Sequence, residues 1–149
     1  MDKLKLIPVN EDNLFHYFEY ESAFEADLKR YQSRIYPDKC AETLRWYHIC
    51  IADKYIGAIW LEKAQGEDFA VLGIFISDSA YRNRGMGTRA IELIIDSDIK
   101  FFNASKIILR VREENNRAIC CYKKAGFAET RRYEKAGLSV IEMVYEVKK

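Results

Sequence analysis

The chain has few residues of the kinds that break helices or form linkers: its 149 residues include two prolines and seven glycines. No stretch rich in proline, glycine or serine divides it, so we expect a single domain over residues 1–149. It also lacks an apolar run of membrane-spanning length and a basic-then-apolar leader at its N-terminus. These absences predict a cytoplasmic protein with no membrane contact.

An excess of one charge sign is also missing, since 24 basic residues face 23 acidic ones. Nucleic-acid-binding proteins usually carry a basic excess, so we expect no nucleic-acid partner. With only two histidines and no C-x-x-C pair, we expect no metal site. We predict that the four cysteines are buried as small hydrophobic side chains, which fits a reducing compartment: Cys40, Cys50, Cys120 and Cys121.

What the chain does contain is the patterning of a folded domain, with 49% apolar and 32% charged residues. Alternating or continuous apolar runs predict strands over residues 4–9, 46–52, 55–61, 69–77, 107–112, 127–133 and 138–147. Helical spacing predicts helices near residues 14–18 and over 24–31, 91–102 and 116–124. The fold class is therefore mixed α/β (α+β), with six to seven strands and about four helices.

A glycine-containing loop follows the apolar strand over residues 69–77 and opens a helix: Arg82, Asn83, Arg84, Gly85, Met86, Gly87 and Thr88. Glycines let backbone amides approach a ligand closely, and the first turn of a helix presents N–H groups without intrahelical partners. Together with the helix dipole, such a turn can seat a phosphate or pyrophosphate. By itself, the loop fits a helix-opening turn with solvated arginines equally well.

The same loop satisfies the dinucleotide-binding fingerprint G-x-G-x-x-G/A through Gly85, Gly87 and Ala90, with Glu113 or Glu114 as the ribose-binding acid. Two features argue against this alternative. Gly85 lies eight residues beyond Ser77, whereas the first glycine should follow its strand almost at once. Only a short helix and a hairpin follow, where further strand–helix–strand units are expected.

A second segment, about thirty residues later, decides between these interpretations: Asn115-Asn116-Arg117-Ala118-Ile119-Cys120-Cys121-Tyr122-Lys123-Lys124-Ala125-Gly126-Phe127. Together the two segments resemble the GNAT superfamily of acyl-CoA-dependent N-acyltransferases. The first is similar to the family's Arg/Gln-x-x-Gly-x-Gly/Ala loop and the second to its Asn-x-x-Ala-x-x-x-Tyr-x-x-x-Gly-Phe helix. The resemblance implies the GNAT fold, with an acceptor-side half (residues 1–68) and an acetyl-CoA-binding half (residues 69–147). It also extends to the ribosomal-protein and polyamine acetyltransferase branches.

The resemblance implies that the loop from Arg82 to Thr88 cradles the pyrophosphate of coenzyme A. The backbone of Phe75, Ile76 and Ser77 would bind the pantetheine arm where the strand splays from its neighbour, although a plain buried strand would look the same. Asn115 would contact the cofactor arm, or serve only as an N-cap. Tyr122 would protonate the departing thiolate, because a phenol with a pKa near ~10 is protonated at neutral pH; otherwise it is a core aromatic.

The sequence departs from many relatives at the general base. Family members often place glutamates at the positions of Val71 and Arg110, neither of which can act as a base. The amine proton could instead pass through water to Glu62, Glu67 or Asp68, or the acceptor could be drawn from its small neutral fraction.

Six acidic residues near the N-terminus are interleaved with aromatic ones: Glu11, Asp12, Glu19, Glu21, Glu25 and Asp27. They could attract a cationic amine, or form a solvated helix face. We expect acetyl transfer from acetyl-CoA to a primary amine by direct attack. The acceptor would be a small cationic amine, or an N-terminus or lysine of a protein. A non-catalytic acyl-CoA-binding or sensing module is the alternative, and the exposed edges of a mixed sheet are compatible with a homodimer.

Overall fold

The seven strands form one mixed sheet. The computed structural model describes residues 3–20, 34, 36–77, 79–81 and 84–148. Within them the strand order is β1-β2-β3-β4-β5-β7-β6, which confirms the upper end of the predicted strand count. The strands are β1 (Leu4–Pro8), β2 (Thr43–Ile51), β3 (Lys54–Lys63), β4 (Phe69–Ile76), β5 (Lys106–Arg112), β6 (Ala128–Lys135) and β7 (Leu138–Glu146).

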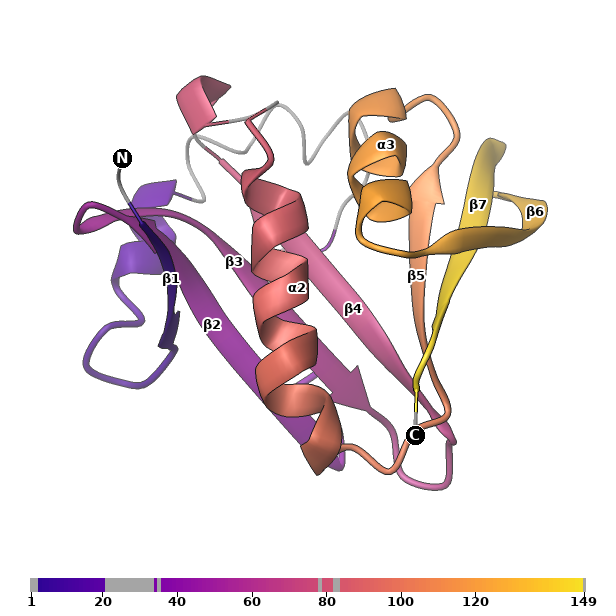
Figure 1. Ribbon diagram of the computed structural model, residues 1–149, viewed down its shortest axis with the longest axis horizontal. Helices are drawn as coiled ribbons and strands as arrows, with labels where there is room; N and C mark the ends of the chain where they lie inside the picture. Colours follow the sequence, from indigo (N-terminus) through magenta and orange to yellow (C-terminus); the bar gives the residue numbers. More distant parts are fainter. Residues whose placement is uncertain (1–2, 21–33, 35, 78, 82–83, 149) are drawn as a thin grey trace.

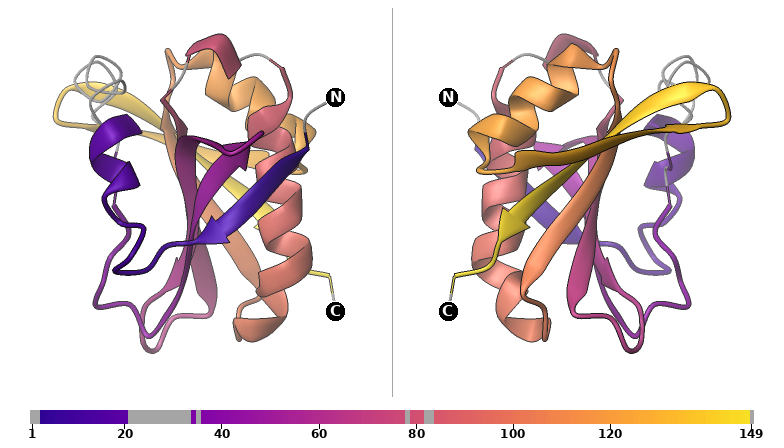
Figure 2. Two further views of the ribbon diagram at one scale, coloured as in Figure 1. Left: turned by 90° about the vertical axis from the view of Figure 1, so that its left-hand side faces the viewer. Right: turned by 90° about the vertical axis from the view of Figure 1, so that its right-hand side faces the viewer.

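In the described part of the chain, helices lie on both faces of this sheet (Figures 1 and 2). α2 (Met86–Asp98) and α3 (Asn116–Lys124) lie on one face, and the helical residues 16–20 lie on the other. Short 3-10 helices are η1 (Ser79–Tyr81) and η2 (Ile99–Phe101), the second of which ends the helix predicted to reach residue 102. The helix predicted over residues 24–31 falls outside the described residues. No helix in the described part of the chain is long and apolar enough to cross a membrane.

Two tight turns set the pairing of the hairpins. Ala52 and Asp53 both have positive φ, as do Ala136 and Gly137, which is the geometry of two-residue hairpin turns. The first hairpin is longer than predicted, because the ladder between β2 and β3 continues as far as Thr43 and Lys63. Backbone hydrogen bonds sustain that extension, whose side chains do not alternate in hydropathy.

The neighbouring strands β4 and β5 separate along their length. They pair in parallel at only three positions, from Phe69 with Lys106 to Val71 with Ile108. Beyond these positions β4 remains paired with β3 and β5 with β7. In Figure 1 the two strands meet at the lower right and diverge toward the top, where α3 lies. The splay predicted for this part of the sheet is therefore present.

Each face of the sheet has its own apolar core. The larger core lies between the sheet and α2 and includes Ile59, Leu61, Ile91 and Ile94. The smaller core, on the opposite face, is aromatic and consists of Tyr17, Tyr20, Ala58, Trp60 and Phe75. Alternation along β3 and β4 sends successive side chains to these two cores.

The prediction that all four cysteines are buried is wrong for two of them. Cys50 is buried and Cys121 half-buried, whereas Cys40 and Cys120 are exposed, and all four are free thiols. Cys120 is exposed because α3 presents one side to the core, and its neighbour Cys121 occupies that side.

Candidate active site

A cavity of about 880 Å³ occupies the region where β4 and β5 separate. Its lining includes the first turn of α2 and much of α3, which lie on one face of the sheet. It also includes Trp60, Glu62 and Arg110, whose side chains belong to the opposite face. The cavity therefore passes through the gap in the sheet and connects the two faces.

At one end of the cavity, α2 begins with a glycine in the left-handed conformation. Gly85 is the N-cap with φ 78° and ψ 8°, and nothing lies within 4 Å of where its Cβ would be. The backbone N–H groups of Met86, Gly87 and Thr88 have no carbonyl partner within the helix, because they belong to its first turn. This end has the geometry of a helix N-terminus that can bind an anion.

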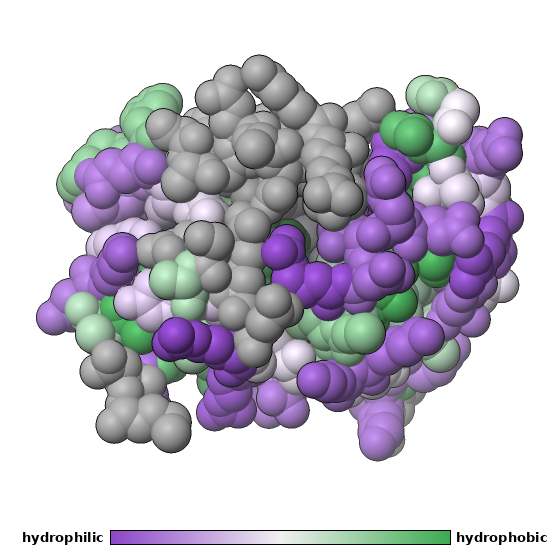
Figure 3. Space-filling model, turned by 90° about the horizontal axis from the view of Figure 1, so that it is seen from above, coloured by the Kyte–Doolittle hydropathy of each residue, from purple (hydrophilic) through white to green (hydrophobic). Residues whose placement is uncertain are grey.

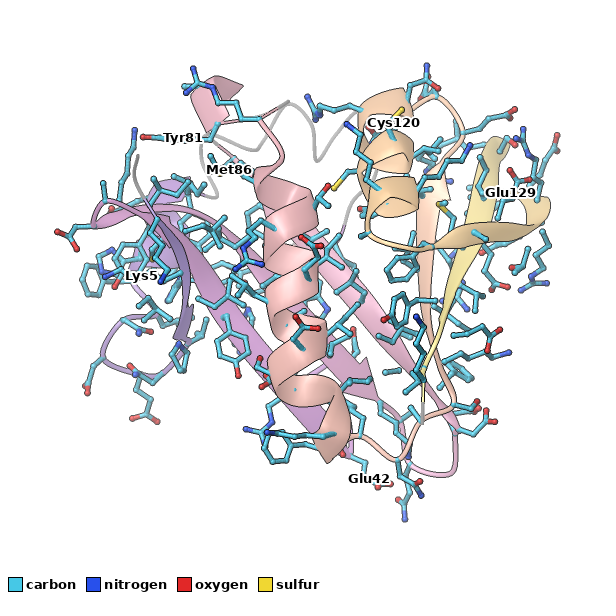
Figure 4. All side chains as sticks on the ribbon, viewed as in Figure 1. Lys5, Glu42, Tyr81, Met86, Cys120 and Glu129 are labelled. Carbon is cyan, nitrogen blue, oxygen red and sulfur yellow. The ribbon has the colours of Figure 1, made fainter. Side chains whose placement is uncertain are left out.

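Gly87 is also required for the packing of two helices, in addition to its predicted place in the cofactor loop. A Cβ at this position would lie 2.8 Å from Cys121 Sγ on α3. Thr88 strengthens the same contact, with its hydroxyl 3.4 Å from the Cys121 carbonyl oxygen. Gly87 thus allows α2 and α3 to approach each other. In Figure 4 Tyr81 and Met86 mark the α2 side of this region and Cys120 marks α3.

Of the loop residues before Gly85, only Arg84 can be described. Arg82 and Asn83 lie outside the described residues, and Arg84 is exposed and does not line the cavity.

The backbone of β4 presents alternate residues to the gap. Ser77 is buried, and its N–H and hydroxyl both donate to the Ile56 carbonyl, at 2.8 and 3.0 Å, so its polar groups face β3. Alternation from this bond directs the backbone groups of Ile76 and Ile74 toward the gap and those of Phe75 toward β3. Ile74 was missed in the sequence because its orientation depends on the register between β3 and β4.

Asn115 and Tyr122 come from α3, and both line the cavity. Asn115 is the N-cap, with its Oδ1 accepting from the Ala118 N–H at 3.4 Å. Tyr122 packs against Phe127 and is half-buried. Burial raises the pKa of the Tyr122 hydroxyl, which makes no hydrogen bond with any residue that the structure describes. A protonated phenol is thus present at the gap.

At the opposite end of the cavity, the indole of Trp60 lies against Gly73. A Cβ at position 73 would lie 2.1 Å from the indole ring, so only glycine allows this contact. Neither residue was singled out in the sequence. The signal available there was the alternation of Trp60 and Glu62 with Ile59 and Leu61, which places the first two on one face.

Glu62, one of the three proposed proton acceptors, lines this end of the cavity and is 6% exposed. Its carboxylate accepts from the guanidinium of Arg34, and from the Trp60 Nε1–H and the Asp38 N–H, each at 3.0 Å. Glu67 and Asp68 do not line the cavity. Of the three predicted proton acceptors, Glu62 is therefore the one that lines the cavity, and it already has three donors.

The positions predicted to lack a base lie where expected. Val71 and Arg110 both line the cavity, on the two strands that separate. Arg110 contacts Glu142 on β7, with Nη2 and Oε1 3.6 Å apart.

The acidic N-terminal cluster does not form part of the cavity where it can be described. Glu11, Asp12 and Glu19 are exposed and do not line the cavity, and Glu21, Glu25 and Asp27 lie outside the described residues. The interleaved Tyr17 and Tyr20 belong to the aromatic core instead.

Comparison with known proteins agrees with this geometry. The profile of the acetyltransferase (GNAT) family matches residues 10–127. Similar structures include an acetyltransferase from Salmonella typhimurium that modifies the N-terminal serine of a 50S ribosomal subunit protein, with a TM-score of 0.82 and 11% identity over 97% of this chain and 95% of that one.

Two further similar structures contain coenzyme A. The aminoglycoside acetyltransferase AAC(6')-Ib, in complex with coenzyme A and kanamycin, has a TM-score of 0.75 and 18% identity over 97% of this chain and 95% of that one. The spermidine N-acetyltransferase from Vibrio cholerae, in complex with CoA and spermine, has a TM-score of 0.73 and 19% identity over 96% and 95%. At these identities the likeness establishes the fold. That fold has a single parallel pair of neighbouring strands, β4 and β5, in the described sheet, which excludes the dinucleotide-binding alternative.

Proposed function

The chain belongs to the GNAT acetyltransferase family, and we propose that it transfers an acetyl group from acetyl-CoA to a primary amine by direct attack on the thioester. The observation that carries this proposal is the continuous cavity. It joins the start of α2 to the opposite face of the sheet through the gap between β4 and β5. Cofactor and acceptor can therefore reach the same gap from opposite faces.

The cofactor would be held mainly by backbone groups. The N–H groups of Gly85, Met86, Gly87 and Thr88 surround the start of α2, where a pyrophosphate is stabilised by hydrogen bonds and the helix dipole. The pantetheine arm would add to the edge of β4 along Ile74 and Ile76. Asn115 would contact the arm from the start of α3. The sequence prediction had assigned these strand contacts to Phe75, Ile76 and Ser77. The proposal keeps Ile76 and adds Ile74, because the backbone groups of these two residues are directed toward the gap.

Tyr122 would supply the proton that the departing thiolate needs. Its side chain lines the cavity, and its raised pKa keeps it protonated throughout the physiological range. The collapse of the tetrahedral intermediate breaks the carbon–sulfur bond, and the sulfur takes the Tyr122 proton. The resulting tyrosinate then recovers a proton from solvent.

The acceptor must arrive at the gap as a neutral amine. The Glu62 carboxylate already accepts three hydrogen bonds from the surrounding protein, so its oxygens are engaged in holding the local structure. We infer that the acceptor is drawn from its neutral fraction and that its final proton leaves through water. It would be a small amine or an amine of a protein, and a homodimer and a cytoplasmic location remain predictions.

Acetyl-CoA consumption across a panel of amines tests this proposal, with free CoA measured by chromatography because the exposed Cys40 and Cys120 would react with a thiol dye. The panel should hold polyamines, aminoglycosides, amino acids and peptides with free N-termini. We expect saturable turnover on one class. Tight acetyl-CoA binding with no turnover on any amine would favour the non-catalytic acyl-CoA-binding module, which the occupied carboxylate of Glu62 would then explain.

A further inference from the structure

The acceptor end of the cavity carries more basic than acidic side chains. Among the described residues that line the cavity away from α2 and α3, four are cationic and two are anionic: Arg34, Arg110, Arg112, Lys135, Asp38 and Glu62. Seen from above, hydrophilic residues gather on the side of α3 and the β6–β7 hairpin, around a smaller apolar area (Figure 3). The excess of basic side chains is unfavourable for a polycationic acceptor, since like charges repel.

The ion pairs at this end leave the excess on the β5 side of the gap. On the β3 side, Arg34 and Glu62 neutralise each other. On the β5 side, Arg110 and Arg131 share the single carboxylate of Glu142, at 3.6 Å and 3.1 Å. Two guanidinium groups on one carboxylate keep a net positive charge, and the side chain of Arg110 is 45% exposed.

Arg110 and Arg112 point to the same face of β5, because a single residue, Val111, separates them along an extended strand. Their Cα atoms are therefore about 6–7 Å apart, and both side chains line the cavity. Across the gap stand Trp60 and Gly73, against which the acceptor would lie. A group bound by Arg110 thus lies on the acceptor face, beside the place where the amine meets the thioester.

We propose that the acceptor carries a carboxylate as well as its amine, as an amino acid does, and that Arg110, with Arg112 beside it, binds that carboxylate. This inference rests on the proposed acetyl transfer. A planar guanidinium can bind a carboxylate through two parallel hydrogen bonds, which fixes both its position and its orientation. The acceptor's carboxylate would also be attracted by the net positive charge on this side of the gap.

Matched pairs of amines test the proposal directly. Ornithine and lysine differ from putrescine and cadaverine only in the carboxylate, and the dependence of each pair's ratio on Arg110 separates binding of that group from its effect on the basicity of the neighbouring amine. We expect kcat/KM to be at least about 10-fold higher for each amino acid than for its decarboxylated partner, as for the loss of one charge-assisted hydrogen-bonded pair.

The variant R110Q should raise KM for the amino acid by about 10-fold or more and leave KM for acetyl-CoA unchanged. The variant R110K, which keeps the charge but loses the planar fork, should lie in between. The matched control is R132Q. Arg132 is an exposed arginine of β6 that binds Glu113 and Glu129 and does not line the cavity, so its loss should leave both KM values unchanged.

The possible results distinguish a failure of the carboxylate proposal from a failure of the proposed acetyl transfer. Higher kcat/KM for putrescine than for ornithine would overturn the carboxylate proposal while acetyl transfer stands. An equal loss for both amines in R110Q would also overturn it, because Arg110 would then act on the fold of the site rather than on the carboxylate. Absence of turnover on every amine, with acetyl-CoA bound, would remove the proposed function and this inference together.

Discussion

Tyr122 illustrates how burial and hydrogen bonding at one residue decide its chemical use. Tyr122 lines the cavity, its hydroxyl makes no hydrogen bond to any described residue, and burial raises its pKa. Glu62 is the opposite case, since its carboxylate accepts from Arg34, Trp60 and the Asp38 N–H. A group without partners can donate its proton to a ligand, whereas one that already has three donors holds the local structure.

Replacing Tyr122 with phenylalanine removes the proton donor and keeps the ring. We expect kcat to fall by about 100-fold or more, as is usual when a general acid is lost, while KM for acetyl-CoA stays the same. Steady-state kinetics on the best acceptor provides the measurement. The control is Y133F, which alters another tyrosine lining the cavity. An unchanged kcat in Y122F, or an equal loss in Y133F, would remove Tyr122 from its proposed role.

At the scale of elements, the site depends on how closely α2 and α3 approach each other. Gly87 lies in the first turn of α2, and Cys121 lies on the side of α3 that faces it. Because the cofactor-binding N–H groups belong to the same turn as Gly87, the spacing of the two helices also sets the position of those groups.

The variant G87A therefore tests this contact with a single added carbon. We expect it to lower the free energy of unfolding by about 1–3 kcal/mol through overpacking against Cys121 Sγ, and to raise KM for acetyl-CoA. In the C121A background the same change should cost nothing, or gain up to about 1 kcal/mol from the higher helix propensity of alanine. Urea denaturation of the four proteins completes the double-mutant cycle.

The control variant is E92A, at an exposed position of α2. It should leave both the free energy of unfolding and the KM for acetyl-CoA unchanged. Additive effects of G87A and C121A, with no coupling, would show that the two helices are not in contact through this pair.

Sequence patterns within short segments predicted the helices and strands well. They did not predict the contacts between segments. The apolar run before Gly85 indicated β4, and the helix cap at Asn115 was foreseen as an alternative role. The contact between Gly73 and the indole of Trp60 depends on the register between β3 and β4, and hydropathy alone does not determine that register. The same holds for Ile74, whose orientation follows from pairing and not from its side chain.

At the scale of the whole molecule, the two faces of the sheet would bind different substrates, which meet at the gap. α2 and α3 occupy the face that would hold the cofactor, and the aromatic core with residues 16–20 occupies the other (Figure 2). The acceptor side therefore depends on how the N-terminal part of the chain packs against β2 and β3. A buried histidine, His48, lies at the centre of that packing.

His48 is 0% exposed and links three segments. Its Nδ1 lies 2.6 Å from the Tyr20 hydroxyl and its Nε2 3.0 Å from Asn13 Oδ1. In the neutral form Nε2–H donates to Asn13, and Nδ1 accepts from Tyr20. Burial, and then the nearby His16, lower the pKa of His48 to about 4. The folded state thus resists a proton that the unfolded chain binds below about 6.5.

Since the unfolded state binds more protons between these two pKa values, the free energy of unfolding should fall as the pH drops from about 6.5 toward 4. The full stabilisation is present above about 6.5, and the loss should total about 2–3 kcal/mol at the lower limit. Urea denaturation at a series of pH values gives the slope. Carboxylates also titrate near the lower limit, so the slope must be compared between variants and not taken alone.

The two histidines of the chain provide that comparison. The variant H48Q removes the titrating ring and should flatten the slope between about pH 5 and 6.5, even if it lowers stability at every pH. The variant H16Q keeps His48 in place and should retain most of the slope. The carboxylates contribute equally to both proteins, so the difference between the two curves belongs to His48. Equal slopes in H48Q and H16Q would mean that another group controls the acid sensitivity of the acceptor side.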